Sequence, residues 1–243
     1  MKNFWDIVNK VIKRADIILL VLDARFPDLT EHVELKDKAG EKPIIFVLNK
    51  ADLADRKTLE KWKNRYRHCI YVSAKQHQGT TILLRKILEL SRGEKVTVGV
   101  VGYPNVGKSS VINALKGRKS AGTSPHSGFT KAMQLVRVTE KIFLIDTPGV
   151  LPYMEKDKIK LAMIGSTDFT KTKDPDLAAM ELIKHKRDLV CKYYDVKEGS
   201  PEKIIEHIAV KYKKLRKGGE PNIDETARMI LKDWQKGKIN LPH

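Results

Sequence analysis

Apolar residues follow two alternating patterns over residues 1–152. Phe4, Ile7, Val8, Val11 and Ile12 have the spacing of one face of an amphipathic helix. Continuous apolar runs rich in β-forming residues recur after it, mostly separated by stretches of helical pattern. This alternation predicts an α/β fold with a mostly parallel sheet. The predicted strands are residues 16–22, 43–48, 69–72, 96–101, 133–138 and 142–145.

The last two predicted strands are separated only by residues 139–141. A connection this short cannot contain the crossover that parallel strands need. We therefore expect these two strands to form an antiparallel hairpin at one edge of the sheet.

Beyond Pro152 the strand pattern ends and helix signals multiply. Ser, Asp and Asn are preferred N-caps, and Pro is favoured at the first helical position. Gly218-Gly219 is expected to stop the middle helix, whose apolar face carries Tyr212 and Leu215. We expect a helical, basic C-terminal domain of residues 153–243 after a domain of residues 1–152. The predicted N-caps are Asp174, Ser200 and Asn222, the first two being followed directly by Pro.

Composition adds a strong positive charge. The chain has 47 Lys and Arg against 30 Asp and Glu, a net charge of +17, which favours a polyanionic partner such as RNA, DNA or an acidic membrane surface. The longest aliphatic run, residues 17–22, is too short to span a bilayer or to serve as a secretory leader. We expect a cytoplasmic protein without a membrane partner, and its two cysteines reduced.

Residues 102–109, GYPNVGKS, fit the pattern GxxxxGK[ST] between a predicted strand and a predicted helix. In this context backbone N–H groups cradle phosphates, Lys108 reaches the β- and γ-phosphates, and Ser109 can bind Mg²⁺. The alternative is a plain glycine turn before a helix. The residues expected to hold the phosphates are Asn105, Val106, Gly107, Lys108, Ser109 and Ser110.

A second phosphate signal follows the last predicted strand, in the sequence Asp146-Thr147-Pro148-Gly149. An acidic residue at the end of such a strand lies beside the phosphate loop, where Asp146 can hold Mg²⁺. The Gly149 N–H can contact the γ-phosphate. In isolation the same sequence fits a simple turn after a strand.

The base is expected to be read by Asn49-Lys50-Ala51-Asp52, after the second predicted strand. Guanine presents N1–H and N2–H₂ side by side, and the Asp52 carboxylate can accept both, whereas adenine offers no such pair. Asn49 can brace the loop, and the Lys50 stem can cover the ring. Residues Ser73-Ala74-Lys75 supply a backbone N–H for guanine O6, which we assign to Ala74, although this short motif more often marks an ordinary loop.

The order of these motifs is base-reading NKAD, then SAK, then the phosphate loop, then DTPG, whereas Ras-like GTPases place the phosphate loop first. With Asp23-Ala24-Arg25-Phe26-Pro27 and Gly128-Phe129-Thr130-Lys131, the chain resembles the circularly permuted GTPases of the YlqF/RbgA type. The resemblance implies a permuted Ras-like P-loop domain that binds GTP, GDP and Mg²⁺. The family is associated with large ribosomal subunit assembly, and together with the positive charge this leads us to expect contact with rRNA. We expect the chain to be a monomer.

The resemblance further assigns Thr130 as the switch threonine on Mg²⁺ and γ-phosphate, and the nearby alternatives are Thr123, Ser124 and Ser127. Lys108, Thr130 and Gly149 then form the expected catalytic set. Ras-like enzymes place a water-orienting Gln where this chain has Val150, which predicts slow hydrolysis alone and stimulation by the ribosomal particle. Asn105 resembles an Asn that binds K⁺ in related GTPases; the alternative is an Asn that braces a tight loop.

Two other functions stay open. The chain could act on a small-subunit or tRNA target, or serve as an RNA-binding scaffold that binds nucleotide without turnover. The basic run of Lys211, Lys213, Lys214, Arg216 and Lys217 could contact RNA phosphates or simply occupy a solvated helix end. We also expect GTP to order residues 123–131 and 146–151 and so to position the helical domain.

Overall fold

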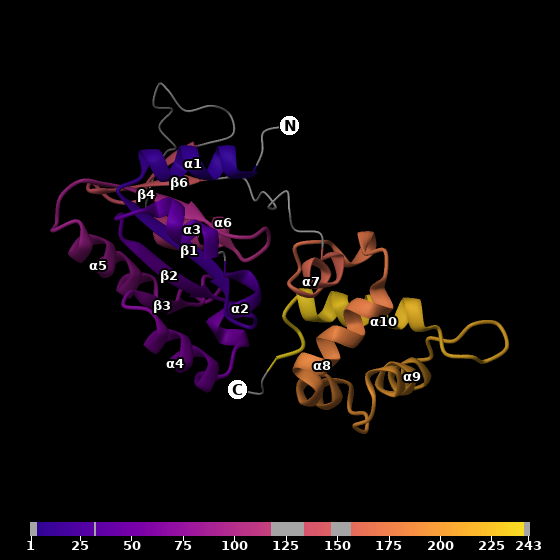
Figure 1. Cartoon of the computed structure of the whole chain (residues 1–243). Helices are drawn as coiled ribbons and strands as arrows, with labels where there is room; N and C mark the ends of the chain where they lie inside the picture. The colour runs from indigo at the N-terminus through magenta and orange to yellow at the C-terminus, as the bar shows by residue number, and fades with distance from the viewer. Residues whose placement is uncertain (1–3, 32, 118–133, 147–156, 241–243) are drawn as a thin grey trace. The chain divides into compact units, whose positions relative to one another are not determined.

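The computed structural model describes residues 4–31, 33–117, 134–146 and 157–240. The chain divides into two compact units, Met1–Met154 and Glu155–His243 (Figure 1). The first unit contains the sheet, and the second contains helices α7–α10.

The first unit is built on a six-stranded sheet with the order β3-β2-β1-β4-β6-β5. All neighbouring strands are parallel except β5 and β6, which pair antiparallel with β5 at the edge. The predicted α/β sheet and its edge hairpin are therefore confirmed. The strands are β1 Ile17–Asp23, β2 Ile44–Asn49, β3 Cys69–Val72, β4 Val96–Val101, β5 Gln134–Arg137 and β6 Ile142–Asp146.

Helices cover both faces of the sheet. Apolar side chains of α1, α3 and α4 pack on one face, where Val11, Leu35 and Trp62 belong to one buried cluster with residues of β1 and β2, and α1 also contacts β4. Helices α5 and α6 contact each other, and the right-handed crossovers place them on the opposite face. The helices of this unit are α1 Phe4–Arg14, α2 Pro27–Thr30, α3 Val33–Ala39, η1 Ala51–Leu53, α4 Arg56–Arg65, α5 Thr80–Leu90 and α6 Lys108–Lys116.

The strand order reverses beside β1. β2, the next strand in the sequence, pairs with one side of β1, whereas β4 pairs with the other side. In open parallel sheets the loops beyond such a reversal point diverge and leave a crevice for ligands. Because β1, β2, β3 and β4 are parallel, the loops that follow them all start at the same edge of the sheet, where the strands have their carboxyl ends. At this edge Asp23 of β1 pairs in register with Asn49 of β2.

The last three helices of the second unit begin at the predicted N-cap residues. The Ser200 hydroxyl and the Asn222 side chain accept hydrogen bonds from Lys203 N and Glu225 N, while Asp174 occupies the predicted N-cap without a side-chain bond. Buried Trp234 donates to Met163 O at 2.9 Å. The elements are α7 Lys158–Met163, η2 Phe169–Lys171, α8 Pro175–Tyr194, α9 Pro201–Lys211 and α10 Ile223–Gln235.

The prediction that Tyr212 and Leu215 continue the face of α9 is wrong. The helix ends at Lys211, because Lys213 adopts a φ of 54° and the amides of Lys213 and Lys214 donate to Val210 O and Ala209 O. This pair of bonds is a Schellman cap. Residues 212–222 then form a narrow turn closed by the bridge between Leu215 and Pro221, which we call the basic hairpin.

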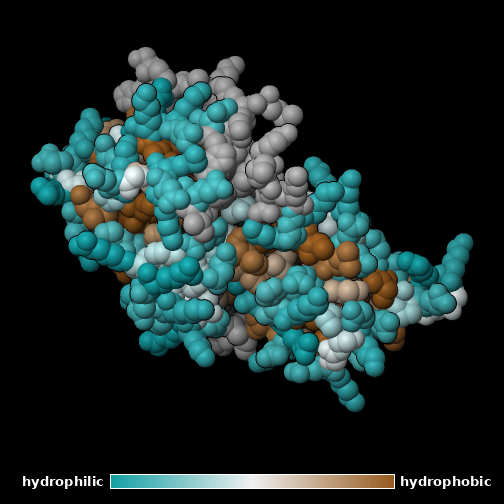
Figure 2. Space-filling model, viewed as in Figure 1, coloured by the Kyte–Doolittle hydropathy of each residue, from teal (hydrophilic) through white to brown (hydrophobic). Residues whose placement is uncertain are grey.

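Hydrophilic side chains dominate the visible face of each unit in Figure 2, with apolar patches between them. Exposed large apolar side chains of the second unit include Leu177, Val210, Tyr212 and Leu215. Among the described residues, no helix combines the length and the apolar character needed to cross a bilayer.

Candidate nucleotide-binding site

The Asn49 side chain joins three of the predicted motifs. Asn49 ends β2 and is 2% exposed. Its amide nitrogen donates to Val106 O in the phosphate loop at 2.8 Å, and its amide oxygen accepts from Ala74 N after β3 at 3.2 Å. Three loops that are far apart in the sequence therefore meet at one side chain. This agrees with the strand order, which brings the carboxyl ends of β2, β3 and β4 to the same edge of the sheet.

The phosphate loop has the backbone of an anion cradle. Gly102, Asn105 and Gly107 have φ values of 148°, 60° and 96°, in the region that favours Gly and tolerates Asn. The loop leads into α6 at Lys108, so the free N–H groups of that helix point toward the loop. Lys108 is 6% exposed, and its ammonium donates to Gly102 O at 3.0 Å and Tyr103 O at 2.7 Å.

Two polar groups of the base-reading loops have no partner. Within the described residues, the Asp52 carboxylate in η1 makes no hydrogen bond or ion pair, and the Ser73 hydroxyl is unpaired although Ser73 is only 1% exposed. A buried hydroxyl without a partner is costly and unusual in a native structure. The arrangement therefore fits a site that is completed by a polar ligand.

Replacing Ser73 by Ala tests this interpretation. Removing an unpaired buried hydroxyl is expected to raise the free energy of unfolding of the nucleotide-free chain by about 1 kcal/mol and to weaken GDP binding about fivefold. Chemical denaturation and titration with a fluorescent GDP analogue measure the two effects. As a control, Thr80→Val removes a hydroxyl that is bonded to His77 O, and it should destabilise the chain without affecting GDP. A Ser73→Ala chain that binds GDP normally would contradict this role.

The amide expected to reach guanine O6 is engaged elsewhere. Ala74 N–H donates to the Asn49 side chain in this structure. The neighbouring amide of Lys75 has no hydrogen-bond partner within the described part of the chain. The Lys75 N–H, next to Ala74, is thus an amide of this loop that is available to a ligand.

Lys50 is held by the buried carboxylate of Asp23, for which the sequence motifs predict no role. Lys50 Nζ donates to Asp23 Oδ2 at 2.7 Å, and Arg25 Nη2 donates to the same oxygen at 2.8 Å. Burial alone would raise the pKa of Asp23, but the charges of Arg25 and Lys50 outweigh it and hold the pKa well below its ordinary value. Burial lowers the pKa of the Lys50 ammonium, with Asp23 opposing that shift.

One feature of the sequence points to this group of charged residues, Asp23, Arg25 and Lys50. Asp23 is a charged residue at the end of the strand Ile17–Asp23, which is otherwise aliphatic and entirely buried. A buried carboxylate must be paired. Its position could have predicted a cationic partner, although nothing in the sequence selects Lys50.

The remaining predicted site residues are described only in part. Ser109 and Ser110 are exposed in the first turn of α6, and Asp146 is the last residue of β6. Thr130, Gly149 and Val150 lie outside the described residues, as do the segments 123–131 and 147–151. No group of three or more His, Cys, Asp or Glu suited to a metal occurs among the described residues. A serine hydroxyl and an aspartate carboxylate are nevertheless the oxygen donors that Mg²⁺ prefers.

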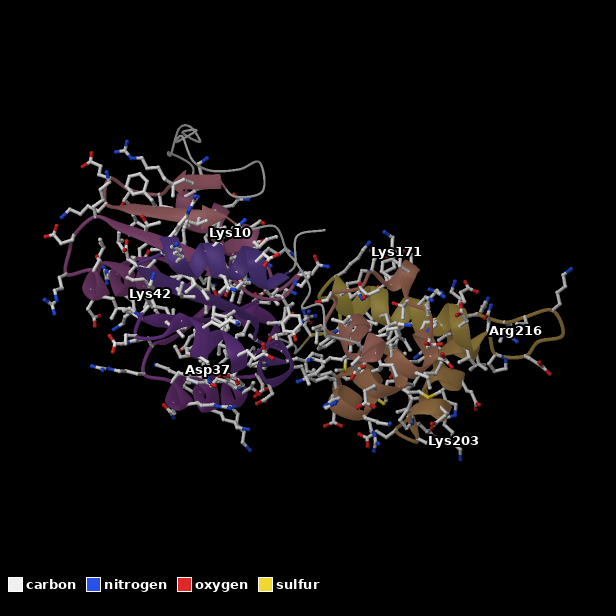
Figure 3. The ribbon with its side chains drawn as sticks, turned by 45° about the horizontal axis from the view of Figure 1, so that its top comes forward. Lys10, Asp37, Lys42, Lys171, Lys203 and Arg216 are labelled. Atoms are coloured by element: carbon white, nitrogen blue, oxygen red, sulfur yellow. The ribbon has the colours of Figure 1, made fainter. Side chains whose placement is uncertain are left out.

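The basic hairpin is a second polar surface, in the other unit. Lys211, the last residue of α9, pairs with Asp195 at 2.5 Å, and Lys214 of the hairpin pairs with Glu225 at 2.6 Å. Within the described residues Lys213, Arg216 and Lys217 have no ion-pair partner. Figure 3 labels Arg216 on the connection between α9 and α10, which Figure 1 shows extending away from these helices. The hairpin thus carries three cations without an ion-pair partner in the described part of the chain, and Tyr212 of the same hairpin is an exposed aromatic residue.

Comparisons with known proteins agree with this geometry. The family model described as 50S ribosome-binding GTPase matches residues 97–218, and the model described as RsgA GTPase matches residues 10–153. A GDP-bound YlqF structure is 25% identical, with a TM-score of 0.71 over 96% of this chain and 95% of that chain. A GNP-bound YlqF from T. maritima has a similar fold, with a TM-score of 0.69 over 96% and 93% of the two chains at 24% identity.

Curated relatives match nearly the whole chain. An uncharacterized GTP-binding protein of Methanocaldococcus jannaschii is 42% identical over 96% of this chain and 65% of its own length. Nucleolar GTP-binding protein 2 of Neurospora crassa is 38% identical over 98% of this chain and 41% of its own length. The chain therefore spans less than two thirds of the relatives it matches.

Proposed function

The chain belongs to the circularly permuted, ribosome-binding GTPases of the YlqF/Nog2 type, and we propose that it is a GTP-hydrolysing switch in assembly of the large ribosomal subunit. Nucleotide binding is supported by one observation: the Asn49 side chain forms hydrogen bonds to both Val106 O and Ala74 N, and so connects the base-reading loops with the phosphate loop at one edge of the sheet. The ribosomal part is supported by the family model, which is described as 50S ribosome-binding GTPase.

The base-reading loops discriminate by hydrogen bonding. The unpaired Asp52 carboxylate accepts N1–H and N2–H₂ of guanine, and the Lys75 amide, or the Ala74 amide after it leaves Asn49, donates to O6. Adenine offers neither pattern, so binding ATP would leave these groups unpaired. The Lys50 stem covers one face of the ring.

The phosphate loop binds and orients the reacting groups. Backbone N–H groups of residues 105–110 surround the phosphates, and the Lys108 ammonium exchanges its bonds to Gly102 O and Tyr103 O for phosphate oxygens. Ser109, Asp146 and Thr130 would hold Mg²⁺, which neutralises phosphate charge when bound. The Gly149 N–H is assigned to the γ-phosphate. A K⁺ site at Asn105 stays a prediction.

The basic hairpin supplies the RNA contact in this proposal. Its unneutralised cations Lys213, Arg216 and Lys217 attract phosphates, and an exposed aromatic ring such as Tyr212 offers a stacking surface to an unpaired base. Val150, in place of a water-orienting Gln, leaves hydrolysis slow until the ribosomal particle supplies or orders the missing group.

The test is GTP hydrolysis with and without purified large subunits. We expect large subunits to accelerate hydrolysis about a hundredfold, the size of effect that one added stabilising group has elsewhere. Replacing Lys213, Arg216 and Lys217 by Gln should reduce this stimulation. It should also reduce the slope of the logarithm of the subunit-binding constant against the logarithm of salt concentration by about 3. Hydrolysis without subunits should not change.

A matched variant controls for net charge. Lys57, Lys61 and Lys203 are also exposed, and their triple replacement by Gln removes the same charge at positions outside the basic hairpin. This variant should keep full stimulation. Stimulation by small subunits alone would favour the small-subunit alternative, and nucleotide binding without turnover on any particle would favour the scaffold.

A further inference from the structure

Lys50 adopts a backbone conformation that needs support. Its φ and ψ are 61° and 36°, the left-handed region that residues with a Cβ rarely occupy. Lys50 directly precedes η1, which carries Asp52, and Leu53 N donates to Lys50 O at 2.9 Å. The conformation of Lys50 therefore sets the path of the backbone toward the base-reading carboxylate.

The support comes from Asp23. Lys50 Nζ lies 2.7 Å from Asp23 Oδ2, and the Lys50 side chain keeps 23% exposure whereas that of Asp23 has 1%. The charged end of Lys50 is thus fixed to a buried group. The exposed part of its side chain remains available to a ligand.

Asp23 itself cannot easily move. Its Oδ1 accepts from Arg25 N and Arg25 Nε, both at 3.0 Å, and its Oδ2 accepts from Arg25 Nη2 and from Lys50. The backbone N–H of Asp23 donates to Thr30 Oγ1 at 3.1 Å, and that hydroxyl donates to Phe26 O. Both ends of Asp23 are therefore fixed, which gives Lys50 an anchor of defined position.

The position of Asp23 in the sheet makes this anchor relevant to the nucleotide. Asp23 ends β1, pairs in register with Asn49 of β2, and β1 also pairs with β4, which leads into the phosphate loop. The anchor thus lies between the base-reading strand and the phosphate strand. Among the described residues Asp23 is the carboxylate bonded to the Lys50 ammonium, and the charge of Asp52 acts on that ammonium without a hydrogen bond.

We propose that Asp23 is a positioning residue for the guanine base: its carboxylate fixes the Lys50 ammonium, so that the lysine stem and the loop carrying Asp52 are preorganised to receive the ring. This inference rests on the proposed guanine-nucleotide site. Arg25 has a different role, because its guanidinium neutralises Asp23 and holds it in place, while its charge repels the Lys50 ammonium.

A double-mutant cycle with Asp23→Asn and Lys50→Met tests the proposal. We expect Asp23→Asn to weaken binding of a fluorescent GDP analogue about tenfold, because Lys50 loses its anchor. Lys50→Met keeps a stem but not the ammonium, and in its background Asp23→Asn should have almost no further effect. In GTP hydrolysis, Asp23→Asn should raise KM about tenfold and leave kcat within about twofold, because the base contacts act equally on substrate and transition state.

Two further variants separate positioning from stability. Arg25→Met removes the other cation from the same carboxylate, and it should lower the Tm with a smaller effect on GDP binding than Asp23→Asn. Asp23→Glu keeps the charge but displaces the carboxylate by one methylene. It should also weaken GDP binding, and it replaces Asp23→Asn in the cycle if that variant does not fold.

The outcomes are distinct. Normal GDP binding by a folded Asp23→Asn chain would overturn the positioning role, and so would an equal loss from Asp23→Asn with and without the Lys50→Met substitution. A non-additive cycle in a chain that large subunits do not stimulate would overturn the ribosomal proposal alone. A wild-type chain that binds no GDP would overturn both.

Discussion

Replacing Asp52 by Asn is expected to exchange the preferred nucleotide from GTP to XTP. The Asp52 carboxylate has no partner within the described residues, so both of its oxygens are available to N1–H and N2–H₂ of guanine. An Asn at this position presents an N–H₂ donor to the guanine N2–H₂ donor. The N2–H₂ bond is thus replaced by a contact between two donors, and the N1–H bond to the Asn oxygen is no longer charge-assisted. We expect GTP binding to weaken by about 4 kcal/mol, or about a thousandfold.

Xanthine has an oxygen where guanine has N2–H₂, so it accepts from the Asn amide while N1–H donates to the Asn oxygen. Competition of GTP, XTP and ATP for a fluorescent GDP analogue measures the exchange. The control is Asp55→Asn, which loses the same charge at the N-cap of α4, where Asn caps as well as Asp. Asp55→Asn should bind GTP normally. Retention of GTP preference by Asp52→Asn would show that another residue reads the base.

The strands of the sheet could be predicted closely because each is a short apolar run between polar residues. The runs 69–72 and 96–101 coincide with β3 and β4, and β1 differs from its prediction only by a shift from 16–22 to Ile17–Asp23. The three predicted C-terminal helix starts are also confirmed. Each has an N-cap residue, and Pro follows it in α8 and α9, and these local signals do not depend on packing.

The end of α9 could not be predicted, since the capping residue is Lys213 in the left-handed conformation. Sequence patterns favour Gly at that position, so Gly218-Gly219 is the stronger stop signal. The packing of Tyr212 against buried Tyr194, with ring centroids 5.3 Å apart, forms only when the helices of this unit assemble. The basic run consequently lies mainly on a hairpin rather than on a helix.

The motif residues of the candidate site were accessible from sequence because each sits in a local pattern at the end of a strand. The contacts between these motifs could not be predicted from the sequence. The Lys50–Asp23 pair joins residues 27 positions apart and the Asn49–Val106 bond joins residues 57 apart. Such pairs depend on the order of strands in the sheet, which a local pattern does not specify. The same reason explains the bond from Ala74 N–H to Asn49 in place of a free amide.

Gly107→Ala is expected to disrupt the site more than any change at its surface. A Cβ at Gly107 would lie 2.2 Å from Asn49 Nδ2, and the φ of 96° is itself unfavourable for Ala. Asn49 would have to leave Val106 O and Ala74 N, so that buried polar groups of three loops lose their partners. At about 1–2 kcal/mol for the backbone and about 1–3 kcal/mol for each unpaired group, we expect a loss of about 4 kcal/mol in stability and at least a hundredfold in GDP affinity.

Gly117→Ala separates the clash from the backbone cost, because the two glycines flank the same helix. Gly117 has a φ of 66° and nothing within 4 Å of an added Cβ. Gly117→Ala should therefore lose only about 1 kcal/mol of stability and bind GDP as the wild type does. Titration with the fluorescent GDP analogue and chemical denaturation of both variants compare the two contributions. If Gly107→Ala resembled Gly117→Ala in both measurements, the Asn49 side chain could move without cost, and the bridge among the three loops would not be what organises the site.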